Sequence, residues 1–103
     1  MHPAVETRLE DVRALCVRFH VRRLALFGSA AKEAPPAEPQ DYDLLVEFDS
    51  LTPAQHAGNY FALLEELETL LKGPVDLVEP GAIRNPIFRQ VVEETQVPLY
   101  AAA

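Results

Sequence analysis

Two short apolar segments separated by a proline-rich stretch constrain the fold of this chain more than any other feature. Residues 24–29 read LALFGS, residues 33–40 contain three prolines, and residues 41–48 read DYDLLVEF. Proline fixes φ and removes an amide donor, so we expect residues 33–40 to form an irregular loop. The flanking runs are rich in residues that favour extended structure, which predicts strands over residues 21–27 and 41–48.

Helical periodicity surrounds these two strands. Apolar residues recur at steps of three and four from Val5 to Phe19, which predicts an amphipathic helix with Cys16 on its buried face. Residues 52–55 read TPAQ, which predicts an N-cap, a proline in the first turn and a capping box. The helix that begins there is expected to extend to Lys72.

The C-terminal part of the chain completes the predicted order of elements. Residues 73–74 read GP and end the long helix, and residues 75–78 read VDLV, which predicts a short strand. A helix is expected over residues 86–94, followed by a short strand or a docked tail at residues 99–100. We therefore predict an α/β (α+β) fold in which helices flank a small sheet of three or four strands. The length of 103 residues suits a single domain over residues 1–103.

The apolar faces of the two later helices are expected to lie in the core. On the long helix this prediction includes Tyr60 and Phe61, and on the last helix it covers Ile87, Phe88, Val91 and Val92. An apolar patch left exposed on the last helix would suit a partner protein or a second copy of the chain. A homo-oligomer therefore stays open at this point.

The net charge restricts the partners of the chain. Nine Lys and Arg against sixteen Asp and Glu give a net charge of −7, which does not favour a nucleic-acid backbone as the main partner. A nucleoside triphosphate remains compatible, because a metal and a few local donors can reverse the field at one site. The single Cys16, the lack of a long apolar run and the absence of a signal peptide at residues 1–4 predict a cytoplasmic protein that does not enter a membrane.

Three aspartates stand out as candidates for metal binding. Side chains alternate along a strand, so Asp41 and Asp43 are expected to project from one face, about 6.6 Å apart. Taken alone, such a pair at the start of a strand is more often a solvated turn than a metal site. Asp76 lies within a segment that we expect to be a buried strand, where an unpaired carboxylate is costly. Lys72 or an arginine could pair with it, whereas a shared Mg²⁺ would satisfy all three aspartates.

The turn after the first predicted strand is suited to phosphate. Gly28 lets the backbone approach a ligand closely, and Ser29 offers a hydroxyl group. The amides that follow open a short helix, whose N-terminus favours anions. A glycine after a strand is by itself more often only a turn, so the weight of this motif comes from its position before the aspartates.

Three separated motifs resemble those of the minimal nucleotidyltransferases, the small single-domain branch of the DNA polymerase beta superfamily. They are LFGSAAKE at residues 26–33, DYDLLVEF at residues 41–48 and PVDLVEP at residues 74–80. The resemblance extends over residues 21–100. It implies a mixed sheet with flanking helices, two Mg²⁺ ions bound together with the nucleotide, and ATP as the substrate.

The resemblance also assigns roles to particular residues. It implies that Asp41 and Asp43 hold both metal ions and that Asp76 binds the catalytic ion near the attacking hydroxyl. It further implies that Gly28 and Ser29 bind the triphosphate. Lys32 is expected to join them as a nucleotide-binding residue.

Residues at three positions differ from the usual pattern of the family. Lys32 and Glu33 stand where Arg and Gly are usual, and Gln40 stands where Ser is usual. Lys32 can meet phosphate as a point charge, without the two-pronged geometry of arginine. Glu33 would repel a triphosphate.

Two functions follow as expectations. The resemblance implies transfer of AMP from ATP to a hydroxyl, and similar proteins often act as antitoxins that modify a tyrosine of a HEPN-type toxin ribonuclease. The alternative is a weak or inactive binding module that neutralises a partner protein by forming a complex with it. Glu33 and Gln40 favour the binding module, and the three aspartates favour the enzyme. An acidic chain would complement a ribonuclease with a basic RNA-binding face in either case.

Overall fold

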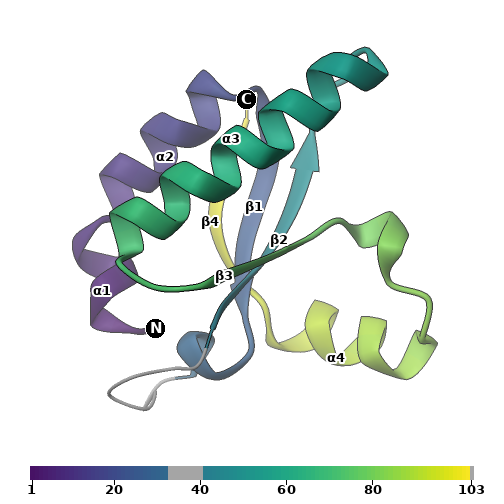
Figure 1. Ribbon diagram of the computed structural model, residues 1–103. Coiled ribbons are helices and arrows are strands. Elements are labelled where there is room, and N and C mark those ends of the chain that lie inside the picture. Colours follow the sequence, from purple (N-terminus) through teal and green to yellow (C-terminus); the bar gives the residue numbers. More distant parts are fainter. Residues whose placement is uncertain (33–40, 103) are drawn as a thin grey trace.

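A mixed four-stranded sheet forms the centre of the molecule. The structure is a computed structural model and describes residues 1–32 and 41–102. The strand order is β3-β2-β1-β4 (Figure 1). β1 (Val21–Phe27) pairs antiparallel with both β2 (Tyr42–Phe48) and β4 (Val97–Ala101), whereas β3 (Val75–Val78) runs parallel to β2. The predicted fold class is confirmed, with β2 beginning one residue after Asp41.

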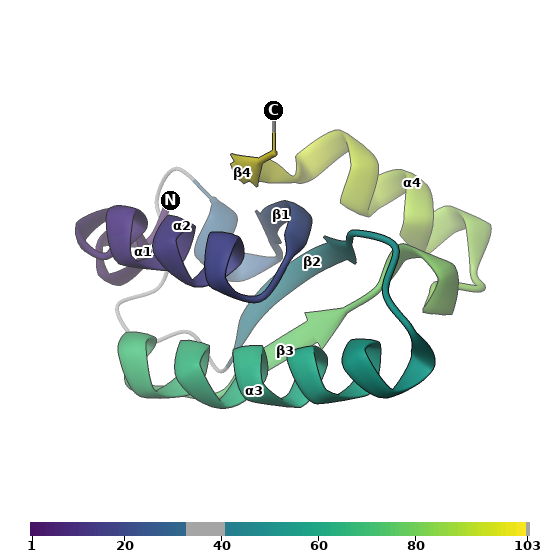
Figure 2. The ribbon, with the colours of Figure 1, turned by 90° about the horizontal axis from the view of Figure 1, so that it is seen from above.

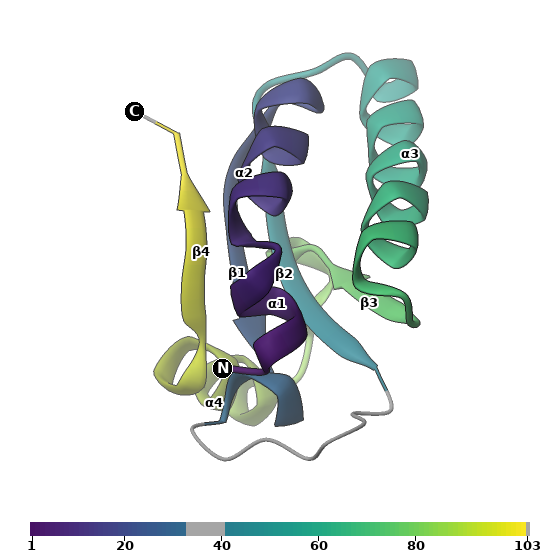
Figure 3. The same ribbon diagram turned by 90° about the vertical axis from the view of Figure 1, so that its left-hand side faces the viewer.

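Helices cover both faces of the sheet to different extents. α1 (Pro3–Thr7), α2 (Leu9–Arg18) and α3 (Pro53–Leu71) lie on one face, with α2 and α3 side by side (Figure 3). α4 (Pro86–Thr95) lies on the opposite face (Figure 2). Two short 3-10 helices, η1 (Ser29–Ala31) and η2 (Pro80–Ala82), follow β1 and β3.

Alternation of side chains along the strands divides the core into two clusters. The larger cluster includes Leu24, Leu26, Leu44 and Val46 and is closed by α1, α2 and α3. The smaller cluster, on the α4 face, consists of Ala25, Phe27, Leu45, Ile83 and Val92. Asp43 lies two residues before Leu45, so its side chain projects on the same face as the smaller cluster.

Local signals place the helix ends. Thr52 and Gln55 form the predicted capping box, each side chain accepting a hydrogen bond from the other's backbone N–H. α3 ends at Leu71 because Lys72 adopts a left-handed conformation with φ of 56°. The predicted N-terminal helix is divided at Arg8 into α1 and α2. No helix in residues 1–32 and 41–102 is long and apolar enough to cross a membrane.

The prediction that both later helices bury their apolar faces was wrong in part. Phe61 on α3 is 65% exposed, and on α4 the exposed fractions are 74% for Ile87, 45% for Phe88 and 50% for Val91. Val92 is the buried residue of α4. For α4 the reason is the small size of the second cluster, which gives this helix only a narrow line of contact with the sheet.

Candidate active site

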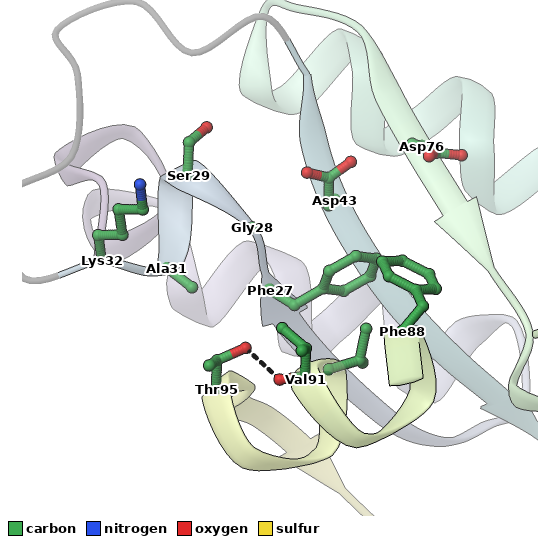
Figure 4. A pocket seen from close by; sticks show the side chains of 11 residues that line it. Phe27, Gly28, Ser29, Ala31, Lys32, Asp43, Asp76, Phe88, Val91 and Thr95 are labelled. Atoms are coloured by element: carbon green, nitrogen blue, oxygen red, sulfur yellow. Dashed lines mark hydrogen bonds between the residues drawn. The ribbon is translucent and has the colours of Figure 1, made fainter. Parts of the chain in front are cut away.

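Five of the six predicted site residues meet at one cavity on the α4 face of the sheet. Its volume is about 690 Å³, within the range of small-molecule sites. Figure 4 shows the polar side, with Gly28, Ser29, Lys32, Asp43 and Asp76, facing the apolar side on α4. The apolar lining is formed by Phe27, Ala31, Phe88, Val91 and Val92, with Thr95 beside them. Asp41 is not among the lining residues.

The sheet register places two of the carboxylates next to each other. Asp43 on β2 pairs with Asp76 on β3, and Phe27 on β1 pairs with Asp43. Paired residues of adjacent strands project on the same face, so Asp43 and Asp76 both point into the cavity (Figure 4). Thirty-three positions along the chain therefore separate two carboxylates that are neighbours in space.

The carboxylates interact electrostatically. The pKa of Asp43 lies above its usual value because burial disfavours the charged form and because the negative charges of Asp76 and Asp41 lie nearby. Asp41 thus acts on Asp43 from just before β2, although it does not line the cavity. A cation placed among these groups would relieve the repulsion.

Gly28 is required by a close approach to Asp43. A Cβ atom at residue 28 would lie 2.2 Å from Oδ2 of Asp43, well inside van der Waals contact. Gly28 also has φ of 72° and ψ of −156°, a region that is almost restricted to glycine. The backbone of the Gly-Ser turn therefore lies directly against the carboxylate.

Ser29 and Lys32 provide the groups that could contact phosphate. Ser29 begins η1 and Lys32 follows it, and both line the cavity. Because η1 has only three residues, it supplies far less of the anion preference that we expected from a helix N-terminus. Glu33 and Gln40, the two unusual residues of the motif, lie outside the described residues.

The prediction that Asp76 is buried was wrong. β3 has a neighbouring strand on one side only, and Asp76 is exposed on it, with Leu77 as the buried residue of the strand. Among residues 1–32 and 41–102, no lysine or arginine forms an ion pair with Asp76. Its accessibility to a ligand thus replaces burial as the reason to assign it a role.

Two side chains of α3 bind the backbone of β3 on either side of Asp76. Tyr60 donates a hydrogen bond from its hydroxyl to the carbonyl oxygen of Leu77, with 2.5 Å between the oxygens. Glu68 accepts a hydrogen bond of 3.1 Å from the N–H of Val75. Burial, with the charges of Glu79 and Asp76, raises the pKa of Tyr60, which keeps its hydroxyl a donor. An edge strand with few backbone partners is fixed in this way.

Sequence reasoning missed Tyr60 and Glu68, and it missed the apolar side of the cavity. Tyr60 was expected only as a core residue. The available signal was its hydroxyl, which needs a partner when the ring is half-buried. Phe88 and Val91 were expected in the core because helical spacing alone does not show how much of a helix the sheet covers.

The donor chemistry of the site fits a hard cation such as Mg²⁺. Mg²⁺ takes oxygen ligands, and one or two carboxylates together with substrate phosphates are commonly enough to hold it. Asp43 and Asp76 supply such a pair. Within the described residues, no three His, Cys, Asp or Glu side chains come together closely enough to form a metal site by themselves. The protein groups alone therefore form an incomplete ligand set.

Comparison with known proteins identifies similar proteins that are named as nucleotide-transferring enzymes. The protein named "Putative protein adenylyltransferase MJ1379" from Methanocaldococcus jannaschii is 36% identical over 77 residues, which cover 75% of each chain. A solved structure described as "Structure of putative minimal nucleotidyltransferase" superposes with a TM-score of 0.68 and 34% identity, covering 96% of this chain and 97% of the other.

A more distant structure shows the same fold within a complex. It contains the tri-AMPylated HEPN toxin of Shewanella oneidensis with the MNT antitoxin. One of its chains superposes with a TM-score of 0.62 and 20% identity, covering 94% of this chain and 72% of the other.

The family model described as "Polymerase beta, Nucleotidyltransferase" matches residues 10–102 of this chain. The matched region contains both strands that carry the carboxylates, together with the Gly-Ser turn. The chain therefore belongs to the polymerase beta nucleotidyltransferase family.

Proposed function

We propose that this chain transfers AMP from ATP to a hydroxyl group of a partner protein. The observation that carries the proposal is the placement of Asp43 and Asp76 side by side in one cavity with the Gly28–Ser29 turn. Two carboxylates suited to a hard cation then face groups suited to a triphosphate. A site that only stabilised the fold would gain nothing from two adjacent, repelling carboxylates.

Each site residue has a role in this proposal. Asp43 and Asp76 in the cavity, with Asp41 just before β2, would hold Mg²⁺ together with the substrate phosphates, with two ions when the nucleotide is bound. When bound, Mg²⁺ supplies positive charge that stabilises the entering and leaving oxygens of phosphoryl transfer. Ser29 and Lys32 contact the triphosphate, Ser29 through its hydroxyl and Lys32 through its charge. Gly28 leaves room for the carboxylate of Asp43 next to the bound nucleotide.

The reaction forms one bond and breaks one bond at the α-phosphorus. The acceptor hydroxyl oxygen bonds to the α-phosphorus of ATP, and the bond from that phosphorus to the oxygen bridging to the β-phosphate breaks. Pyrophosphate leaves with the bond electrons. We assign the hydroxyl proton to Asp76, which is exposed at the cavity and is an oxygen base.

The comparisons support a protein acceptor. One relative carries the name of a protein adenylyltransferase, and the fold recurs in a complex with an AMPylated HEPN toxin. We infer that the acceptor of this chain is a tyrosine of a HEPN-type toxin and that the modification makes this chain an antitoxin. We further propose that residues 1–103 act as one domain, in the cytoplasm, where ATP is available.

Co-expression with a HEPN-type toxin from the same genome tests the proposal. With ATP and Mg²⁺ added, intact-mass spectrometry should show the toxin gaining one or more AMP units. Replacement of Asp43 by Asn should abolish the added mass while leaving the complex intact. An unmodified toxin beside the wild-type chain, under conditions where the complex forms, would refute transfer to the toxin.

A second function is favoured by one specific observation. Because the described side chains alone form no three-residue metal site, a binding module that neutralises its partner without catalysis is the competing proposal. Toxin neutralisation that survives the Asp43→Asn change in full would favour it. Neutralisation lost together with the AMP mass would exclude it.

A further inference from the structure

We propose that the exposed apolar face of α4, formed by Ile87, Phe88 and Val91, is the docking surface for the protein that carries the acceptor hydroxyl. The inference rests on the proposed function and names the surface through which the acceptor reaches the site. It concerns a part of the molecule that neither binds phosphate nor carries a carboxylate.

The folded chain uses only a small part of this face for its own packing. α4 contacts the sheet through Val92, and Phe88 adds an edge-on ring contact with Phe27, with 6.1 Å between the ring centroids. Val91 lies four residues after Ile87 and three after Phe88, so the three side chains form one stripe along the helix. Three large apolar side chains that lie together and exposed mark an interaction surface more often than a solvated one.

The beginning of α4 is held firmly in place. The Asn85 side chain accepts hydrogen bonds from the N–H groups of Ile87 and Phe88. The guanidinium of Arg89 donates to the carbonyl oxygens of Pro80 and Ile83, which connect the helix to η2. A surface that is already ordered loses little conformational entropy when a partner binds.

The apolar stripe is continuous with the candidate active site. Phe88 and Val91 line the same cavity as Asp43 and Asp76 (Figure 4). Ile87 is not among the lining residues. An occupant that covers the whole stripe must therefore extend beyond the cavity. A nucleotide held inside the cavity at Gly28 and Ser29 would leave Ile87 uncovered, because Ile87 is not a lining residue. A protein surface with one side chain inserted into the cavity would cover the whole stripe.

Charge distinguishes a partner protein from a second copy. Two copies of this chain would bring together two net charges of −7, which opposes self-association. A partner with a neutral or basic rim around an apolar patch would be attracted instead. We therefore commit to a neutral or basic acceptor protein whose accepting hydroxyl lies beside an apolar patch.

Replacement of Ile87 by Glu tests the docking surface, and Val17→Glu is the matched control. Both side chains are exposed and apolar, both changes add one negative charge, and Val17 lies on α2, across the sheet from the cavity. Glutamate in the first turn of α4 is also compatible with the helix dipole. Calorimetry should show Ile87→Glu binding the HEPN-type toxin at least about tenfold more weakly. Val17→Glu should bind it as the wild type does, and the affinity for ATP with Mg²⁺ should be unchanged in both.

Other outcomes would overturn the docking surface. Toxin binding that is unchanged by Ile87→Glu, or weakened equally by Val17→Glu, would do so, as would a wild-type chain that forms no complex. Weaker ATP binding with intact toxin binding would assign the stripe to the nucleotide. A wild-type dimer that Ile87→Glu dissociates, again with intact toxin binding, would assign it to self-association. A complex that forms through α4 but transfers no AMP would refute the proposed function and leave the docking surface standing.

Discussion

The two sides of the cavity are built in contrasting ways. The sheet side consists of short polar groups whose positions are fixed by strand register, by a glycine without room for a Cβ, and by hydrogen bonds from α3. The α4 side consists of long apolar side chains on a helix that contacts the sheet along a narrow line. Chemistry at a phosphorus atom needs atoms placed accurately, whereas recognition of a protein surface needs apolar area.

This contrast separates two kinds of mutation. Changes on the sheet side should alter turnover and leave partner binding intact, and changes on the α4 face outside the cavity should do the reverse. If changes on both sides altered turnover and partner binding alike, this separation of roles between the two sides of the cavity would be contradicted. Variants at Asp43, Gly28 and Tyr60 test the sheet side, and Ile87→Glu tests the α4 side.

The largest effect is expected from Asp43→Asn. Removing a carboxylate that both holds the cation and faces the phosphate should lower the rate of AMP transfer on the order of 10³-fold. Asp49→Asn, an exposed change of the same charge just after β2, should leave the rate unchanged. A radiolabelled ATP transfer assay measures both. Comparable rates in the two variants would remove Asp43 from the site.

The same variant should be more stable than the wild type at neutral pH. Because the pKa of Asp43 is raised above its usual 3.8, the folded chain keeps this proton to higher pH than the unfolded chain does. Stability therefore falls as the pH rises from 3.8 through the raised value, and it stays lower above that value. Asparagine removes this penalty, so the Tm of Asp43→Asn should exceed that of the wild type at pH 7. The difference should vanish below pH 3.8.

The next largest effect is expected from Gly28→Ala. The new methyl group would displace the Asp43 carboxylate, and the backbone conformation would cost about 1–3 kcal/mol. We expect transfer to fall about 10²-fold, with a lower Tm. Gly58→Ala is the control, since Gly58 lies in α3 and a Cβ added there would have nothing within 4 Å, so alanine should raise the Tm slightly. Thermal unfolding and the transfer assay together check the pair.

Most of the fold could be predicted because its signals are local. The capping box at Thr52 and the apolar strands each act over a few residues, and the elements they predict are present. The loop predicted from the prolines of residues 33–40 lies outside the described residues. The exposure of Phe61 and Ile87 could not be predicted in the same way. Periodicity shows which side of a helix is apolar, but the area of the sheet beneath it depends on tertiary packing.

The residues of the site could be predicted from the sequence, but the contacts and the strand order that hold them in place could not. Asp43 and Asp76 were assigned from their positions on strands, and the register brings both to one cavity. The expected burial of Asp76 failed, because a four-residue apolar segment reads the same at the edge of a sheet as at its centre. Which strand lies at the edge follows from strand order, and no short motif encodes that order.

The smallest effect is expected from loosening the backbone around Asp76. Tyr60→Phe keeps the ring and removes the hydroxyl that binds Leu77, at a cost of about 1 kcal/mol. A purely structural role would lower only stability. If Tyr60 positions Asp76, kcat should fall about tenfold at a temperature where the variant is fully folded, with little change in the KM for ATP. Tyr100→Phe on β4, at the other edge of the sheet, should change neither kcat nor the KM for ATP.

Glu68 provides an independent check on the same strand. Glu68→Gln keeps an oxygen that can accept from the N–H of Val75, whereas Glu68→Ala does not. We expect the alanine variant to show the kcat loss of Tyr60→Phe and the glutamine variant to retain wild-type turnover. If the charge of Glu68 mattered instead, glutamine would be as harmful as alanine. Comparing the kcat of Glu68→Gln with that of Glu68→Ala thus decides whether β3 is held by a hydrogen bond or by the charge of Glu68. Of the two, only the hydrogen bond fixes the direction in which Asp76 points.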